Sequence, residues 1–209
     1  PTTEVATPGS VRYSTRSLTS INRKKYLDTD EITNVDYTLL NGFEFAAYYK
    51  NFRLQGEYIK SDVHRLNDQP TEKFQGFYVM GSCMLFGGNY RYNKAEAEFT
   101  QPGRGRTWGD IELALRYDMI DLNSRMDGIM GGAGEGYTAG VNFYANDAVK
   151  IMLNYSYVNH DRYANGKGKL FTGYDTNGIL TANPANIVNE KGKAGEDFSI
   201  VSVRFEIDF

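Results

Sequence analysis

Apolar and polar residues alternate at every second position over long stretches of the chain. Between Ile111 and Met119 the odd-numbered residues are apolar or aromatic, and most even-numbered residues from Asp110 to Asp118 are charged. A period of two is the pattern of a β-strand that has one apolar and one polar face. The pattern predicts an all-β protein with eight strands, at about residues 10–17, 36–49, 52–64, 74–86, 107–121, 136–145, 149–161 and 197–209.

The connections between these strands alternate in length. Lys50-Asn51 and Asn146-Asp147 are candidates for tight two-residue turns, because a new alternating run follows each of them at once. The connection at 87–106 breaks the rule, since its place predicts a short turn but it runs for about twenty residues. Short turns between neighbouring strands predict an antiparallel up-and-down meander, in a single domain over residues 1–209. The long connections are polar and rich in Gly, Asn and Asp, and they span 18–35, 65–73, 122–135 and 162–196.

A sheet with one charged face and one Tyr/Phe/Leu/Val face fits two kinds of protein. In a soluble sandwich or ligand-binding barrel the apolar face points inward, whereas in an outer-membrane barrel it meets lipid and the polar face lines a lumen. Strand runs of about ten residues match the length that a tilted strand needs to cross a bilayer. Loops that are short at one end of the strands and long at the other are typical of bacterial barrels. We therefore favour a transmembrane barrel in the bacterial outer membrane.

Aromatic residues support the same interpretation. They gather toward the strand ends, where the membrane interfaces of a barrel lie: Phe43, Tyr49, Phe52, Phe77, Phe143, Phe198 and Phe209. The last strand also ends on an aromatic residue, which resembles the C-terminal signal of barrels inserted into bacterial outer membranes. Twelve residues are predicted to face lipid: Ile111, Leu113, Leu115, Tyr117, Val141, Phe143, Ile151, Leu153, Tyr155, Val203, Phe205 and Ile207.

Composition narrows the classes of function. An aromatic content of 14% argues against disorder, and the lack of any run of about 18 apolar residues excludes a transmembrane helix. The single cysteine, Cys83, excludes a disulfide framework and a cysteine-based zinc site. A net charge of -3 argues against nucleic acid as a partner. Ser156 and His160 share a face but lie about 13 Å apart along a strand, too far for a nucleophile–base pair, so we expect no enzyme. We also expect no cofactor and no metal.

The middle and end of the chain resemble the phosphate-selective porins O and P, over about residues 70–209 and more weakly before them. The stretches that carry the resemblance are 76–79, 85–88, 90–92, 108–117, 121–123, 137–144 and 149–155. The resemblance implies a sixteen-stranded, homotrimeric diffusion porin of which this chain is the second half. It also implies an extended periplasmic turn at 87–106. Gly88 departs from the family, which usually has an acidic residue there, and the absent first half keeps phosphate selectivity from carrying over.

Charged residues on the polar faces are the candidate pore-lining residues. They are Arg12, Arg16, Glu44, Arg53, Glu57, Glu112, Arg116, Asp118, Lys150, Arg204 and Glu206, with Asp110 and Asp208 on the same faces. Guanidinium groups on neighbouring strands, such as Arg12, Arg16 and Arg53, would form a track for anions. Alternatively, the mixed charges pair across strands and only keep the wall hydrated.

These observations predict a water-filled outer-membrane channel for passive diffusion of small solutes, including anions such as phosphate. The alternative is a small closed barrel that acts as an anchor or adhesion protein without a pore. We place the tight turns in the periplasm, and we expect the 162–196 connection, with Lys167, Lys169, Lys191 and Lys193, to fold over the outer mouth or onto a neighbouring protomer.

Overall fold

A computed structural model of the chain describes residues 2–4, 9–16, 18–19, 25–124, 129–160, 173–181, 186, 188 and 197–207. Its elements are antiparallel β-strands, as the alternation predicts. They are β1 (Thr2–Glu4), β2 (Arg12–Thr15), β3 (Leu27–Asp28), β4 (Val35–Tyr49), β5 (Phe52–Arg65), β6 (Glu72–Met84), β7 (Asn89–Asn93), β8 (Glu98–Gly103), β9 (Asp110–Ser124), β10 (Ile129–Tyr144), β11 (Val149–His160), β12 (Gly173–Tyr174), β13 (Leu180–Thr181) and β14 (Asp197–Ile207). No helix within the described ranges is long and apolar enough to span a membrane.

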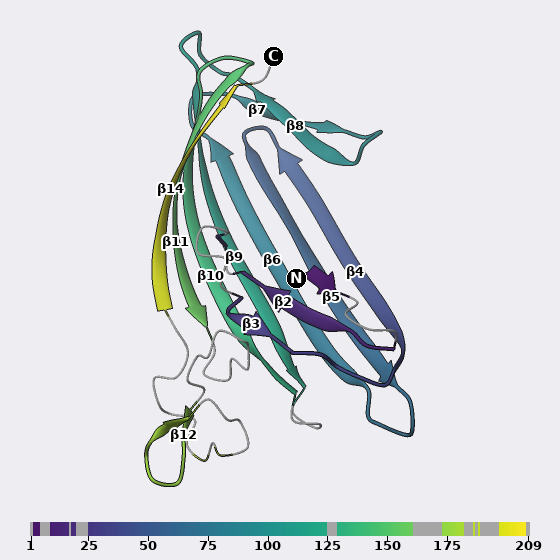
Figure 1. Ribbon diagram of the computed structural model, residues 1–209. Helices are drawn as coiled ribbons and strands as arrows, with labels where there is room; N and C mark the ends of the chain where they lie inside the picture. Colours follow the sequence, from purple (N-terminus) through teal and green to yellow (C-terminus); the bar gives the residue numbers. More distant parts are fainter. Residues whose placement is uncertain are drawn as a thin grey trace.

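Seven long strands form one curved sheet, which we call the wall sheet (Figure 1). Its order is β14-β11-β10-β9-β6-β5-β4, so the strands follow one another along the chain, and the β7–β8 and β12–β13 pairs lie in the connections. Strands β4 and β14 are the two edges and do not pair with each other in the described part of the chain. The sheet is therefore open, and the described residues do not close a barrel.

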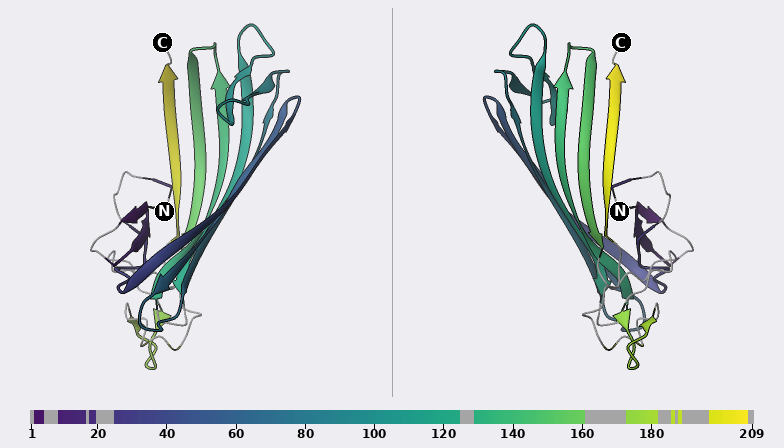
Figure 2. Two further views of the ribbon diagram at one scale, coloured as in Figure 1. Left: turned by 90° about the vertical axis from the view of Figure 1, so that its right-hand side faces the viewer. Right: turned by 90° about the vertical axis from the view of Figure 1, so that its left-hand side faces the viewer.

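The predicted strand over 10–17 forms, but outside the wall sheet. It is β2, which pairs with β1 and β3 in a three-stranded sheet that we call the inner sheet. Figures 1 and 2 show the inner sheet lying against one face of the wall sheet, which we call the inner face. The sequence period identifies a strand, but it does not say to which sheet the strand belongs.

The largest apolar core lies between these two sheets. Buried residues of the inner-sheet segment pack against buried side chains of the wall sheet: Val11, Tyr13, Leu27 and Ile32 against Val63, Phe74 and Leu122. Two backbone hydrogen bonds between Val11 and Ile32, of 3.0 and 2.9 Å, extend the inner sheet toward β4. Apolar burial of this kind fixes the inner sheet on the wall.

The wall strands mostly match their predicted positions, except that two neighbouring strands are longer than predicted. Residues 122–135 were expected to be a long loop, but β9 and β10 pair across this range as far as Ile129 and Ser124. Inner-face Ile120 and Leu122 pack against the inner-sheet core, and small Gly134 makes room for Leu27. Because the covered part of the inner face is apolar or glycine, the pattern of a polar inner face ends there although the strands continue.

The tight turns differ in length. Lys50-Asn51 is a two-residue turn, with Tyr49 and Phe52 paired across it and Lys50 at a φ of 53°. The second turn is longer than the predicted two residues, because β10 ends at Tyr144 and β11 begins at Val149. There the Ala145 N–H donates to the Val149 carbonyl at 3.0 Å. The exceptional 87–106 connection folds as the β7–β8 hairpin at the same end of the sheet (Figure 1).

The outer face of the wall sheet, opposite to the inner sheet, carries an apolar band. All twelve residues predicted to face lipid share this face, as the pairing of Leu113, Val141, Leu153 and Val203 across four strands illustrates. Leu115 is 69% exposed and Val203 70%, so these side chains do not pack into a closed core.

Aromatic rows border the band at both ends. Toward the end that carries the long connections, Phe77 and Tyr117 lie 5.7 Å apart and Tyr117 and Tyr137 5.0 Å apart between ring centroids. At the other end Trp108 lies 5.0 Å from Phe86 and 6.3 Å from Phe143. Beyond the first row the outward residues become polar: Lys60, Asp62, Lys73, Gln75, Asp121, Glu135 and Asn159.

One sequence-based expectation needs correction, and two others concern residues outside the described part of the chain. Phe198 belongs to the inner face, where it pairs with Val158 and its ring contacts Tyr26 at 5.3 Å. Asp208 and Phe209 lie outside the described residues, as does most of the 162–196 connection with its four lysines. From that connection the structure describes the short β12–β13 pair.

Candidate functional site

Hydrogen-bonded charge pairs dominate the inner face. Its central residue, Glu112, is 1% exposed and projects from β9 beneath the β7–β8 hairpin. Its carboxylate accepts hydrogen bonds from four side chains: Tyr90 (2.7 Å), Asn142 (2.8 Å), Tyr144 (2.8 Å) and Arg53 (3.0 Å). A buried carboxylate needs this number of donors to offset the loss of water. Glu112 therefore acts as an anchor of the wall, and it is shielded from solutes.

The hairpin rests on this anchor. Tyr90 of β7 also bonds Ser82 at 2.7 Å, and it packs with Met84, Tyr144 and Phe99 in a small apolar cluster. Burial raises the pKa of the Tyr90 hydroxyl above its ordinary value, and hydrogen bonding to Glu112 raises it further. The hydroxyl therefore stays a neutral donor. Arg53 lies beneath Tyr90 and Phe99, with its guanidinium 4.9 and 5.2 Å from their ring centroids.

Asp110 fixes the base of the same hairpin. It is fully buried, and its two oxygens accept backbone N–H bonds from Phe86 (3.0 Å), Gly88 (2.7 Å), Gly105 (2.9 Å) and Ile111 (2.8 Å). A side chain at Gly88 would place its Cβ 2.6 Å from the Asp110 carboxylate and 2.4 Å from the Gly103 carbonyl. The backbone at Gly88 thus approaches Asp110 and Gly103 too closely for any side chain.

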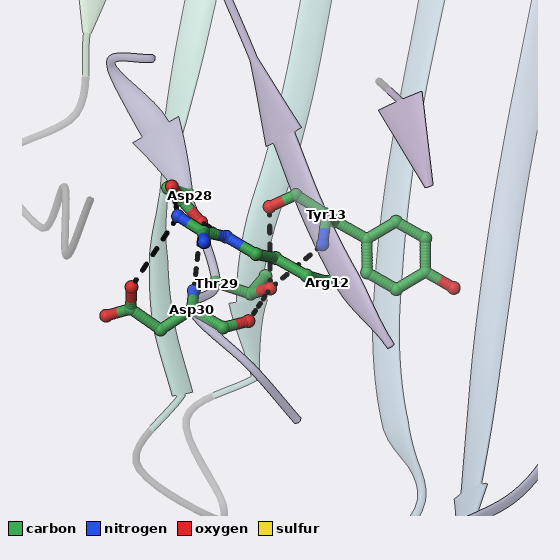
Figure 3. Close-up of polar contacts among 5 residues, drawn as sticks. All are labelled: Arg12, Tyr13, Asp28, Thr29 and Asp30. Carbon is green, nitrogen blue, oxygen red and sulfur yellow. Dashed lines mark hydrogen bonds and ion pairs between the residues drawn. The ribbon is translucent and has the colours of Figure 1, made fainter. Parts of the chain in front are cut away.

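Arg12, a predicted pore-lining residue, belongs to the inner sheet. Figure 3 shows its guanidinium against Asp28, which is fully buried, and near Asp30. Arg12 Nε donates to Asp28 Oδ1 at 2.7 Å, and its Nη2 forms a second bond to Oδ2. Thr29 joins the strands, because its hydroxyl accepts from the Tyr13 N–H at 3.1 Å. The charge of Arg12 is therefore largely neutralised by Asp28.

The three arginines suggested as an anion track do not lie on neighbouring strands of one sheet. Arg16 follows β2 and is exposed, Arg12 lies in the inner sheet, and Arg53 lies on β5 under the hairpin.

The other predicted basic residues are also paired. Arg116 Nε donates to Asp118 at 2.8 Å while its guanidinium lies 3.9 Å from the Tyr78 ring centroid. Lys150 and Arg204 both contact Glu206, at 2.7 and 2.8 Å. Arg53–Glu112 and Lys150–Glu206 pair across strands, as the pairing alternative expected. Arg116–Asp118 and Arg204–Glu206 pair within a strand instead.

Two predicted carboxylates differ from the rest. Glu44 and Glu57 stand directly opposite each other on β4 and β5. Neither forms an ion pair with another described residue. Like charges directly opposite each other disfavour pairing of the strands. Glu44 and Glu57 are therefore negative charges on the inner face that no described cation compensates.

Sequence reasoning missed several members of this site. Arg65 donates to buried Glu72 at 3.0 Å, although neither residue stood out as a candidate. Asn142 and Tyr144 are neutral residues whose parity places them beside Glu112, but only the strand register reveals it. Within the described part of the chain, no group of three His, Cys, Asp or Glu residues is placed to hold a metal ion. Ser156 bonds Thr138 at 2.8 Å and His160 stacks on Tyr26, so both have structural roles.

The paired charges leave the inner face slightly acidic. The wall strands present five basic inner-face residues, Arg53, Arg65, Arg116, Lys150 and Arg204, and seven acidic ones, Glu44, Glu57, Glu72, Asp110, Glu112, Asp118 and Glu206. The sheet thus has an apolar outer face and a charged inner face, the polarity of an outer-membrane barrel.

A comparison with protein families gives the same assignment. The sequence model of the phosphate-selective porins O and P matches residues 3–181, from β1 to β13. The chain belongs to the phosphate-selective porin O and P family. The match starts well before residue 70, so it includes the inner sheet and β4 and β5. A search of curated proteins found no match. Because members of this porin family are outer-membrane porins, membership implies a channel rather than an enzyme.

Proposed function

We propose that the wall sheet is a sector of an outer-membrane porin that lets small hydrophilic solutes diffuse through a water-filled lumen. The exposed apolar band of the outer face carries the proposal. Monomeric soluble proteins rarely expose contiguous apolar patches of more than a few hundred Å². Moving each such side chain from water into lipid stabilises the fold by about 1–2 kcal/mol. Outer-membrane lipid is the partner that covers such a band.

The height of the band supports a membrane setting. On β11 the outward apolar and aromatic residues run from Val149 to Tyr157. This length corresponds to about 26 Å along the strand at ~3.3 Å per residue. At a tilt of about 40° it spans roughly 20 Å along the membrane normal, close to the band of known barrels.

The two edge strands of the wall sheet need further strands to pair with. Strands β4 and β14 expose backbone groups that lipid cannot satisfy, so a membrane-embedded sheet must pair both edges. We propose that this chain contributes seven strands to a barrel of about sixteen, assembled as a homotrimer, as the family resemblance implies. The open curvature argues against a separate closed barrel with an anchoring role. The Lys50-Asn51 turn and the 145–148 turn would then lie in the periplasm.

Selectivity follows from the charge pairs. A fixed positive field lowers the entry cost of an anion, but Arg53, Arg116, Lys150 and Arg204 are each held by a carboxylate. We therefore propose that phosphate and other anions pass this wall without being selected by it. Any strong anion preference would have to come from residues outside the wall sheet.

Planar-bilayer recording tests the proposal. We expect the purified natural protein to insert as stepwise, ohmic conductance increments. The reversal potential in a KCl gradient then measures the anion preference of the whole pore. Replacing chloride by phosphate measures the phosphate contribution directly. Protein that folds in detergent but never forms conductance steps would contradict the channel function.

A further inference from the structure

We propose that the lumen holds a binding site for small organic cations with an apolar body, in a cavity between the inner sheet and the wall sheet. The inference rests on the proposed function, because such a solute reaches the cavity through the lumen. The cavity measures about 450 Å³. Small-molecule sites commonly measure about 300–1,000 Å³.

Glycines of the wall keep this space open. Gly76 and Gly134 flank Ile120 in register on the inner face, so three strands contribute a single side chain to that row. The inner-sheet segment rests close to the wall beside them. A Cβ at Gly134 would lie 3.3 Å from Leu27, and a Cβ at Gly136 would lie 2.9 Å from Leu18. Leu27 and Leu18 therefore contact the wall at Gly134 and Gly136, while the space next to Ile120 stays open.

Apolar side chains form much of the lining. Ile59, Ile120 and Leu40 border the cavity from the wall, and Tyr13 borders it from the inner sheet. Leu40 lies on the inner face and is 66% exposed. An apolar ligand body would remove these side chains from water, which favours binding.

The charges of the lining favour a cation. Glu57, Arg116 and Asp118 all border the cavity. Arg116 is already committed to Asp118 and to the Tyr78 ring. Glu57 has no recorded cation partner among the described residues, and it faces Glu44 across the strand pair. An ammonium group beside Glu57 would form a charge-assisted hydrogen bond, while an apolar body lies against Ile59 and Ile120.

Three probes separate the two parts of this recognition in planar bilayers. Phenethylamine carries the cation and the apolar body, ethylamine carries the cation alone, and phenylacetate carries a similar body with a negative charge. We expect phenethylamine to reduce or interrupt the ion current saturably at millimolar concentration, and to do so at a concentration at least about fivefold lower than the other two. Equal effects of phenethylamine and ethylamine would overturn the site while leaving the channel function intact.

Two matched variants locate the effect. Glu57→Gln removes one carboxylate of the lining and should raise the half-blocking concentration of phenethylamine about fivefold. Glu98→Gln removes the same charge from exposed β8, outside the lining, and should change it less than about twofold. Equal shifts in the two variants would show a general field effect and overturn the site. Titration of phenethylamine into detergent-solubilised protein, followed by calorimetry, gives a readout that does not depend on conductance, and a lack of saturable heat would also overturn it. Absence of conductance steps with saturable heat would contradict the channel alone.

Discussion

Replacing Asp110 by Asn should release the β7–β8 hairpin from the wall. Oδ1 of Asp110 accepts the N–H groups of Phe86 and Ile111, and Oδ2 accepts those of Gly88 and Gly105. An Asn side chain keeps one oxygen, so two buried N–H groups lose their acceptor in either orientation of the amide. At about 1–3 kcal/mol for each unsatisfied group, the local cost is about 2–6 kcal/mol.

Hydrogen exchange measured by mass spectrometry reads this cost directly. Because 1.4 kcal/mol corresponds to a factor of ten, amides of residues 87–106 should exchange at least about 30-fold faster in Asp110→Asn. Peptides from β11 should keep their protection, which separates hairpin release from global unfolding. Asp147→Asn is the matched control, since Asp147 is 87% exposed in its contact with Arg104 and should change exchange less than about threefold. Protection of 87–106 that stays within about twofold of the natural protein would refute the anchoring role of Asp110.

Three further changes test other parts of the structure. Leu153→Arg should destabilise the membrane-inserted barrel by about 2–4 kcal/mol, measured by urea unfolding from lipid vesicles. Met152→Arg on the inner face should destabilise it by less than half as much. Equal losses of stability would contradict the assignment of faces. Arg12→Met leaves buried Asp28 without its cation, and should destabilise the inner sheet by about 3–5 kcal/mol, seen as faster exchange of residues 9–32 but not of β10 and β11. Cysteine at Asn177, but not at Asn146, should react with a membrane-impermeant maleimide on whole cells, and the reverse pattern would invert the proposed orientation.

The sequence predicts the wall better than what lies inside it. Outward residues such as Leu113 and Leu153 alternate strictly with polar neighbours because each wall strand separates two media. The polar character of the inner face ends at Ile120 and Leu122, since the inner sheet covers them, while Asp121 between them points outward. Val11 and Tyr13 alternate as a wall strand would, yet they pack into the core between the two sheets.

The candidate site is harder to predict than the strands. Parity places Arg53 and Glu112 on polar faces, but they are 59 residues apart in the chain, and no spacing rule pairs them. Arg12 and Asp28 meet because β2 and β3 form a separate sheet. Tyr90 reaches Glu112 only because the 87–106 connection folds back over the inner face, which a loop-length estimate does not reveal.

Accessibility of spin labels on neighbouring residues of β11 tests most directly whether the two faces meet lipid and water. Leu153 belongs to the outer face and Met152 to the inner face. Each would carry a nitroxide on an introduced cysteine, in a Cys83→Ser background reconstituted in lipid vesicles. We expect the label at Leu153 to collide with oxygen, which concentrates in lipid, and the label at Met152 to collide with a water-soluble nickel chelate. A label at Leu153 that prefers the nickel chelate, or equal preferences at both sites, would contradict a lipid-facing outer face.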